Sequence, residues 1–365
     1  MTSGRGAVLQ AGEFVIYDLE FGEPGVGEVL VKLTASGLCH TDLGVMAGGI
    51  PFPTPGIIGH EGAGTVERVG AGVTAVVPGD KVLMSFTSCG ACGGCRSGHP
   101  AYCETWLPRN LLGAMRGADS ATPNRDGEPI AAHFFGQSSF AQYAIADERS
   151  LVKVAQDADL VALAPLGCGV LTGFGSMWNV LDPGTDDIVA VYGTGAVGLS
   201  GVIAAKTREP RTLIAIDIVE ERLELARELG ATDTINAKTE DVAARIAEIT
   251  GGHGVDKSFD TTGNPVVARG ALDAAAVGGT VLVCGAPPPG TEIAVDIQGI
   301  LTGKVLRGVT MGDSDPTVLI PQLVAMHAAG TLPLEKLEKR YSLDDIAAAA
   351  HDMHSGATVK PVIVF

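Results

Sequence analysis

The sequence predicts an α/β protein in which a β-rich domain is joined to a doubly wound parallel sheet. Its length of 365 residues exceeds what a single hydrophobic core usually supports, so two domains are expected. Short apolar runs separated by glycine and proline fill the first 90 residues, a pattern typical of β-strands. From about residue 185, apolar strands alternate with helical segments, as in a parallel sheet flanked by helices.

The individual elements follow from local patterns. In the first 90 residues the strand candidates are "EVLVKLTASG", "AGTVERVG" and "DKVLMSF", and residues 104–147 form a loop-rich excursion that ends in "FAQYAIA". Later, the strands "DIVAVYG", "TLIAID", "VDKSFDTTG" and "TVLVCGA" alternate with the helices "AVGLSGVIAAKT", "VEERLELARELG" and "VVARGALDAAAVGG". We assign the parallel sheet to residues 170–310. The β-rich domain takes 1–169 and 311–365, because the helix "LDDIAAAAHDMHSG" and the strand "KPVIVF" return to it.

Composition narrows the functional classes. The formal charge of -17, with no basic stripe, argues against nucleic-acid and anionic-membrane partners. We find neither a secretory signal pattern nor an apolar run of 18 residues, so we expect a cytoplasmic protein with no membrane partner. Thiols stay reduced in that compartment, where clustered cysteines bind metal more often than they pair.

A glycine-rich segment predicts a dinucleotide site. "VYGTGAVGLS" fits G-x-G-x-x-G at Gly193, Gly195 and Gly198, follows an apolar strand and opens a helix. Asp217 ends the next strand 19 residues after Gly198 (217 − 198), where an acid can bind the ribose hydroxyls. Because a carboxylate repels a 2′-phosphate, the sequence favours NAD over NADP.

Four of the seven cysteines lie in "SCGACGGCRSGHPAYC", at Cys89, Cys92, Cys95 and Cys103. Four thiolates at this spacing suit a closed tetrahedral zinc site that braces a loop. An iron–sulfur cluster remains an alternative, although the last spacing differs from the bacterial ferredoxin run. A disulfide framework is disfavoured by the reducing compartment.

The other cysteines lie far apart along the chain. Cys39 is in "GLCHTDL", His60 and Glu61 are in "GHEGAG", and Cys168 is in "PLGCGVLTG". Two cysteines and one histidine are a ligand set for catalytic zinc. The long separations leave open whether these side chains meet, and each of them is also compatible with an ordinary core position. Cys284, after a buried strand, is interpreted as a core residue.

Taken together, the motifs resemble those of the zinc-dependent medium-chain alcohol dehydrogenases. "GHEGAG", "VPGDKV", the cysteine cluster, "CGVLTGFGS", "GTGAVGLS" and "ELGATDTIN" occur in the order found in that family. The resemblance implies a GroES-like catalytic domain and a Rossmann domain, NAD, and two zinc ions per subunit. It also implies a small-molecule alcohol or aldehyde substrate and a homo-oligomer, with a dimer favoured over a tetramer.

The resemblance also implies individual roles. Cys39, His60 and Cys168 would bind catalytic zinc with Glu61 nearby, the four clustered cysteines would bind structural zinc, and Thr41 would take the alcohol proton. The implied cofactor contacts are His40, Thr172, Gly193, Gly195, Ala196, Val197, Gly198, Asp217, Arg222 and Lys360. Some relatives pass the proton on to a histidine at the position of Gly44, which leaves the final proton acceptor open here.

"HFFGQSSFAQY" and "GDSDP" resemble segments of aryl-alcohol dehydrogenases of the benzyl alcohol type. The corresponding pocket residues would be Ile50, Phe86, Phe134 and Phe135, an apolar wall suited to aromatic or allylic alcohols. We therefore expect reversible NAD-dependent oxidation of such alcohols. The alternatives are a dehydrogenase that keeps its NAD bound, an enzyme for other primary alcohols or for a glutathione–formaldehyde adduct, and a non-catalytic zinc and NAD binding protein.

Overall fold

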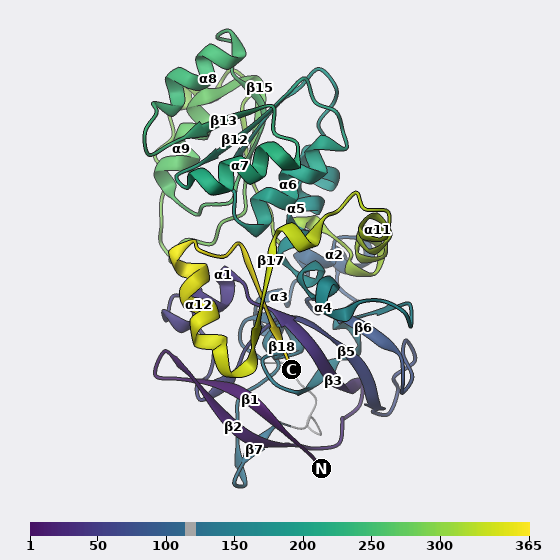
Figure 1. Cartoon of the computed structure of the whole chain (residues 1–365). Coiled ribbons are helices and arrows are strands. Elements are labelled where there is room, and N and C mark those ends of the chain that lie inside the picture. The colour runs from purple at the N-terminus through teal and green to yellow at the C-terminus, as the bar shows by residue number, and fades with distance from the viewer. Residues whose placement is uncertain (114–121) are drawn as a thin grey trace. The chain divides into compact units, whose positions relative to one another are not determined.

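The computed structural model describes residues 1–113 and 122–365, and the chain divides into two compact units (Figure 1). The first unit contains Met1–Cys168 and Asp315–Phe365, and the second contains Gly169–Ser314. The first unit is discontinuous in sequence because the last 51 residues (365 − 314) leave the second unit and rejoin the first. The chain passes from the first unit to the second after Cys168 and returns to the first after Ser314.

Two sheets of short strands build the first unit. The smaller sheet has the order β4-β1-β2-β7-β8 and the larger has the order β10-β6-β5-β3-β18-β17, with β9 also paired to β3. The strands of the smaller sheet are β1 (Thr2–Gln10), β2 (Glu13–Phe21), β4 (Gly56–Ile57), β7 (Asn124–Arg125) and β8 (Glu128–Pro129). Those of the larger sheet are β3 (Glu28–Gly37), β5 (Glu61–Val69), β6 (Lys81–Met84), β9 (Tyr143–Asp147), β10 (Leu151–Val154), β17 (Glu338–Ser342) and β18 (Lys360–Val364).

The core of the larger sheet comes from alternating apolar side chains. Val29, Val31 and Leu33 on β3 are buried together with Val66 on β5 and Val82 on β6. The period of two places these side chains on one face, which is why the sequence reads as β in this region. The C-terminal strand β18 pairs with β3 and fastens the tail to this sheet. The first unit's helices are α1 (His40–Met46), α2 (Gly93–Arg96), α3 (Trp106–Asn110), α4 (Leu160–Leu163), α11 (Pro316–Ala328) and α12 (Ile346–Ser355).

A fully parallel sheet forms the second unit, in the order β13-β12-β11-β14-β15-β16. Counted along the chain this order is 3-2-1-4-5-6, the doubly wound dinucleotide-binding arrangement. Its strands are β11 (Ile188–Tyr192), β12 (Thr212–Asp217), β13 (Asp233–Asn236), β14 (Val255–Asp260), β15 (Ala275–Val283) and β16 (Val305–Gly308). The predicted fold class is therefore confirmed.

Helices connect these parallel strands. α6 contacts α7, and α8 contacts α9, so the helices form two pairs packed on the sheet. The bounds are α5 (Gly169–Gly175), α6 (Ala196–Lys206), α7 (Glu220–Leu229), α8 (Val242–Thr250), α9 (Pro265–Ala274) and α10 (Ile297–Ile300). The predicted helix "VVARGALDAAAVGG" ends earlier than expected, because Ala275 already pairs with Val255 as the first residue of β15. Pairing between β14 and β15, inside the sheet, overrides the helix propensity of the alanines there.

In the described parts of the chain no single helix has the length and apolarity needed to cross a membrane. One bent pair, Leu160–Gly167 with Gly169–Leu181, passes that test by length and composition only.

Candidate metal and dinucleotide sites

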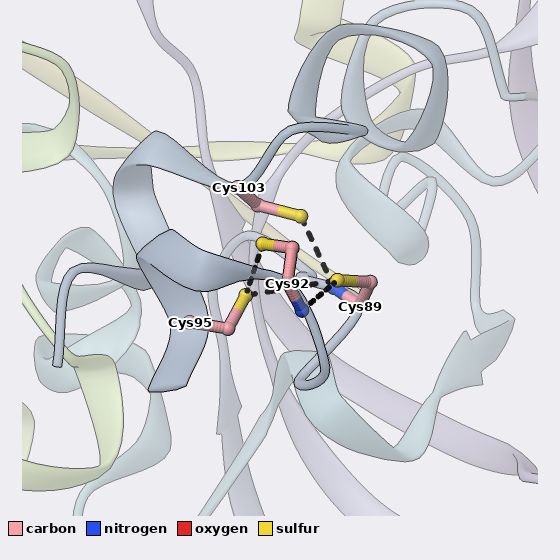
Figure 2. A group of neighbouring side chains, drawn as sticks. All are labelled: Cys89, Cys92, Cys95 and Cys103. Atoms are coloured by element: carbon pink, nitrogen blue, oxygen red, sulfur yellow. Dashed lines mark hydrogen bonds between the residues drawn. The ribbon is translucent and has the colours of Figure 1, made fainter. Parts of the chain in front are cut away.

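The four clustered cysteines form a compact lobe (residues 89–103), whose side chains converge on one point (Figure 2). All four thiols are free, and their sulfur atoms lie within 4.8 Å of one another. Cys89 and Cys95 are 3.8 Å apart at Sγ, and Cys92 and Cys95 are 3.5 Å apart. Figure 2 shows the short helix α2, which carries Cys95, folded back over this point.

These separations fit one tetrahedral zinc ion. Zinc–sulfur bonds of about 2.3 Å in tetrahedral geometry place neighbouring sulfurs about 3.8 Å apart. A disulfide would need about 2.05 Å, and an iron–sulfur cluster would spread the thiolates around several iron atoms. Backbone N–H groups of Ala91 and Cys92 donate to the Cys89 sulfur and lower the pKa of that thiol, which favours the thiolate needed for a metal.

The second donor set is assembled from distant segments. Cys39 is the N-cap of α1, His60 immediately precedes β5, Glu61 begins β5, and Cys168 follows the turn Ala164–Gly167. Their ligand atoms also lie within 4.8 Å of one another, and all four residues are buried. The structure thus brings together the residues that sequence reasoning could not join.

The orientation of His60 fits a metal. Its Nδ1 is 3.1 Å from Oδ1 of Asp42, whereas its Nε2 is buried and has no hydrogen-bond partner among the described residues. A fully buried polar atom without a partner is costly, and a metal ion would supply the missing interaction. Burial lowers the pKa of His60, but Asp42 and Cys39 outweigh it and raise that pKa to about 10.

Asp42 supports both ligands and was not singled out from the sequence. Its carboxylate accepts hydrogen bonds from the backbone N–H of Cys39 at 2.9 Å and of Gly59 at 3.2 Å, in addition to its contact with His60. Asp42 is the third residue of α1, a position at which acids often bond back to the helix N-cap. The three-residue spacing from Cys39 to Asp42 in "CHTD" was the sequence signal that could have identified Asp42.

Glu61 is held by a buried cation. Nζ of Lys360 donates to both carboxylate oxygens of Glu61 at 2.8 and 2.9 Å and to the carbonyl of Leu38 at 3.1 Å. Lys360 is 1% exposed, so its ammonium is committed to this ion pair. Burial raises the pKa of Glu61, and Lys360 opposes that effect. A side chain at Gly37 would overlap the Glu61 carboxylate, so glycine is required at that point of β3.

The short helix α1 carries the other predicted residues of this site. Thr41 Oγ1 is 3.9 Å from the sulfur of Cys39, and His40 is exposed. At Gly44, a side chain would approach Cδ1 of Ile50 to 2.9 Å. Ile50 therefore fills the space beside Gly44.

Aromatic rings surround His60. Phe135 stacks on the imidazole with ring centroids 4.4 Å apart and planes at 24°, and Phe134 meets it edge-on at 5.5 Å. Two further rings were missed by the sequence reading: Phe52 packs on Phe134, and Trp106 packs on Phe135. Neither ring lies in a recognisable motif. The predicted pocket residue Phe86 is 2% exposed, but no ring contact joins it to this group among the described residues.

The segment that carries these rings is fixed by polar contacts. Gln137, 1% exposed, donates to the carbonyls of His60 and Ser85 and accepts from the N–H of Gly62. His133 and Phe135 have positive φ angles of 79° and 54°, which non-glycine residues rarely adopt. Such backbone persists only where surrounding contacts over-determine it, and it is concentrated at functional sites.

In the second unit, the glycine loop has the geometry of a phosphate cradle. Gly193 has a φ of +83°, and a side chain there would approach Thr261 Oγ1 to 2.6 Å. A side chain at Gly198 would overlap the carbonyl of Gly193, because helix α6 packs closely on the turn. At Gly195 a side chain would meet only open space, which leaves room for a pyrophosphate at the N-terminus of α6. Ala196 and Val197 are the first two residues of α6.

Asp217 lies at the end of β12 and is 9% exposed. Its carboxylate accepts from the N–H and hydroxyl of Thr194 in the glycine loop and from the N–H groups of Ile218 and Val219. Asp217 therefore braces the loop, and these donors stabilise its charge.

The remaining predicted residues of the second unit lie elsewhere in its helices and loops. Arg222, half-buried, is in the first turn of α7. Thr172 is buried in α5, with its hydroxyl 4.0 Å from the sulfur of Met311. Cys284, expected in the core, is half-buried.

Comparison with known proteins agrees with this geometry. A family model of zinc-binding dehydrogenases matches residues 196–325, and one of alcohol dehydrogenase GroES-like domains matches residues 25–156. A geraniol dehydrogenase of Castellaniella defragrans is 41% identical over 100% of this chain and 98% of its own length. An S-(hydroxymethyl)glutathione dehydrogenase of Escherichia coli is 37% identical, with 95% of each chain covered. The crystal structure of benzyl alcohol dehydrogenase from Acinetobacter calcoaceticus superimposes with a TM-score of 0.94, at 40% identity and 100% coverage of both chains.

The chain belongs to the zinc-dependent alcohol dehydrogenase family. The resemblance drawn from the motifs is thereby confirmed, and so are the GroES-like and Rossmann-type folds of the two domains. The expected cofactors, zinc and a nicotinamide dinucleotide, agree with the family and with the two donor sets. Small alcohols or aldehydes are the corresponding substrates.

Proposed function

We propose that this protein oxidises primary aromatic or allylic alcohols reversibly to aldehydes, with NAD as the hydride acceptor. The observation that carries the proposal is the group of aromatic rings around His60, because Phe134 contacts this residue of the buried donor set and Phe52 packs on Phe134. Flat apolar substrates gain most from aromatic walls of this kind. Two relatives matched over the whole chain bear the names of a geraniol and a benzyl alcohol dehydrogenase, which supports the same substrate class.

The residues of the buried set would divide the work as follows. Cys39, His60 and Cys168 would hold zinc, which supplies a Lewis acid that polarises the alcohol oxygen. Asp42 fixes the ring of His60, so that Nε2 faces the metal position. The Thr41 hydroxyl would relay the alcohol proton, accepting it while passing its own proton on to the cofactor ribose. We assign Glu61 to a supporting role beside the metal, balanced by Lys360.

NAD rather than NADP is proposed because Asp217 carries a negative charge at the end of β12. A carboxylate there can accept from a ribose hydroxyl and repels a 2′-phosphate. The glycine loop would hold the pyrophosphate through Gly193, Gly195, Ala196, Val197 and Gly198, with Thr172, Arg222, His40 and Lys360 as further contacts. For Lys360, binding a phosphate would require its ammonium to be shared with Glu61.

A substrate panel tests the proposal. Purified zinc-loaded enzyme is assayed with benzyl alcohol, geraniol, ethanol and S-(hydroxymethyl)glutathione, each with NAD and NADP. We expect kcat/KM for benzyl alcohol and geraniol to exceed that for ethanol by at least about 100-fold, since burial of the aromatic ring or of the apolar chain contributes about 3 kcal/mol. Preference for ethanol or for the glutathione adduct would refute the substrate class, and preference for NADP would refute the role of Asp217.

Retained cofactor separates a dissociating dehydrogenase from one that keeps its NAD. We expect the purified protein to lose NAD on gel filtration and to need added NAD in every turnover. One tightly held NAD per chain, with activity only towards an added electron acceptor, would favour the alternative. A reducing cytoplasm, the compartment we propose, would keep the ligand thiols available.

We also propose a homodimer formed through the outer edge of the parallel sheet. β16 is the edge strand, and Val277, Ile297, Leu301 and Val305 expose 81%, 73%, 78% and 45% of their surfaces near it. An edge strand flanked by apolar side chains can pair antiparallel with its own copy about a two-fold axis. Light scattering should give about twice the 37.2 kDa chain mass, and Leu301→Asp should lower it towards one chain.

A further inference from the structure

The rings of Phe134 and Phe135 contact His60 with different geometries, although the two residues are neighbours in the sequence. Phe135 lies almost parallel to the imidazole of His60, with centroids 4.4 Å apart, whereas Phe134 meets that imidazole edge-on at 82°. Phe135 also meets two rings edge-on, Trp106 at 5.6 Å and 88° and Phe134 at 4.9 Å and 69°. Phe134 packs in addition on Phe52, at 5.1 Å. Among the described rings, only Phe135 contacts both His60 and Trp106.

The backbone holds Phe135 in this position against its own preference. The residue has φ 54° and ψ 31°, and it is 2% exposed. Gln137 ties the segment to the carbonyl of His60 and to the N–H of Gly62. The same short segment of chain therefore carries the ring of Phe135 and, through Gln137, holds the backbone of His60.

Trp106 extends the stack to the cysteine lobe. It is the first residue of α3, and its backbone N–H donates to the carbonyl of Cys103 at 2.9 Å. Asn110, fully buried at the end of α3, donates to the carbonyl of Thr87 and accepts from its N–H. A continuous path of contacts therefore runs from Cys103 through Trp106 and Phe135 to His60.

We propose that Phe135 is a positioning residue for His60, and that Trp106 joins it to the cysteine lobe. Phe135 would fix the plane of the imidazole through its face, while Asp42 fixes the ring at Nδ1. Through the aromatic stack, a well-ordered cysteine lobe would help to fix the side-chain positions of the buried donor set. This inference rests on the proposal that His60 binds the catalytic zinc, and it assigns to Phe135 a role other than substrate contact.

The test follows the metal as well as the turnover. Phe135→Leu keeps an apolar side chain but removes the ring, so we expect the affinity of the buried site for zinc to fall about 10-fold. After replacement of zinc by cobalt(II), the visible absorption bands should shift, because they report the ligand geometry. kcat should fall more than KM rises.

Matched variants separate positioning from packing and from substrate contact. Phe134→Leu should raise KM for benzyl alcohol and shift the cobalt spectrum less than Phe135→Leu does, because Phe134 meets the imidazole only edge-on. Phe21→Leu removes a buried ring that contacts Tyr143 and should lower only the thermal stability. Trp106→Leu should weaken zinc binding in the same direction as Phe135→Leu, whereas Trp106→Phe, which keeps a ring, should restore it.

An unchanged zinc affinity and cobalt spectrum in Phe135→Leu, with only KM altered, would overturn the proposal and make Phe135 an ordinary pocket residue. If Phe135→Leu does not fold, the comparison of Trp106→Leu with Trp106→Phe tests the proposal. Equal zinc affinity in these two variants would refute a role for the aromatic stack. The zinc affinity and the cobalt spectrum are measured without alcohol. Their outcome therefore does not depend on the result of the substrate panel. Loss of both zinc ions from wild-type protein without effect on turnover would instead refute the role of His60.

Discussion

The two metal-binding regions solve the same coordination problem in different ways. In the cysteine lobe, four thiols come from 15 consecutive residues (89–103), and three of them are only partly buried. In the buried set, Cys39, His60, Glu61 and Cys168 come from segments up to 129 residues apart (168 − 39), and each is at most 7% exposed. Four thiolates suit a closed structural site, whereas two cysteines and one histidine leave a fourth position for substrate.

The difference shows what each site depends on. The lobe needs only a short local turn, with backbone N–H groups that stabilise the Cys89 thiolate. The buried set needs β3, β5 and the turn before α5 to be folded already, and it needs Asp42 and Lys360 to balance its polar groups. We therefore expect changes in the lobe to affect stability first, and changes in the buried set to affect turnover first.

Cys168→Ser should have the largest effect, because it removes a ligand from the buried set. Loss of a supporting partner alone costs 10- to 100-fold, so we expect benzyl alcohol turnover to fall more than about 100-fold. Metal analysis should find one zinc fewer per chain. Undiminished turnover with one zinc fewer would remove the catalytic role of this set.

Cys95→Ser tests the other half of the comparison. One zinc should again be lost, but here the melting temperature should fall, because structural zinc contributes directly to folding. At a temperature where the variant is still folded, turnover should stay within about 10-fold of wild type, a loss the stacked rings could transmit. A loss as large as that of Cys168→Ser would show that the two regions do not divide the work in this way.

The Lys360–Glu61 pair gives the third contrast, since the cysteine lobe contains no comparable buried cation among its described residues. Lys360→Met leaves the Glu61 carboxylate buried without its partner, which should lower the free energy of unfolding by about 3–5 kcal/mol. Urea denaturation measures this value. The double variant Lys360→Met with Glu61→Gln removes both charges and should recover most of the loss; equal destabilisation of both variants would mean that the pair is not the cause.

The sequence predicted the cysteine lobe more completely than the buried set, for a physical reason. Cys89, Cys92, Cys95 and Cys103 are close in sequence, so spacing alone limits what they can bind. Cys39 and Cys168 could be joined only through the family resemblance, because their meeting depends on strand pairing across the whole first unit. The glycine loop was predictable, since its pattern is local and two of its glycines, Gly193 and Gly198, have close steric neighbours.

Contacts made through space left little trace in the sequence. Phe52, in a loop, and Trp106, at the start of the short helix α3, reach the rings near His60 from segments without a motif. The ion pair of Lys360 joins residues 299 positions apart, and nothing near either residue indicates it. Asp42 is the exception, because its place three residues after Cys39 already suggests a bond to the helix N-terminus.

Asp42→Asn should have the smallest effect of the four changes, and it measures how far the buried set depends on its supporting hydrogen bonds. The amide keeps the shape, but it has one accepting oxygen in place of two. That oxygen can keep either the bond from the N–H of Cys39 or the contacts with Gly59 and His60, and the amide lacks the charge that favours a proton on Nδ1 of His60. We expect zinc affinity at the buried site to fall about 10- to 100-fold, with kcat restored at high zinc concentration. The lobe should keep its zinc, since Asp42 contacts none of its cysteines in the described structure. If Asp42→Asn binds both zinc ions as tightly as wild type, the buried set is rigid without this carboxylate, and the ring of Phe135 becomes the main restraint on His60.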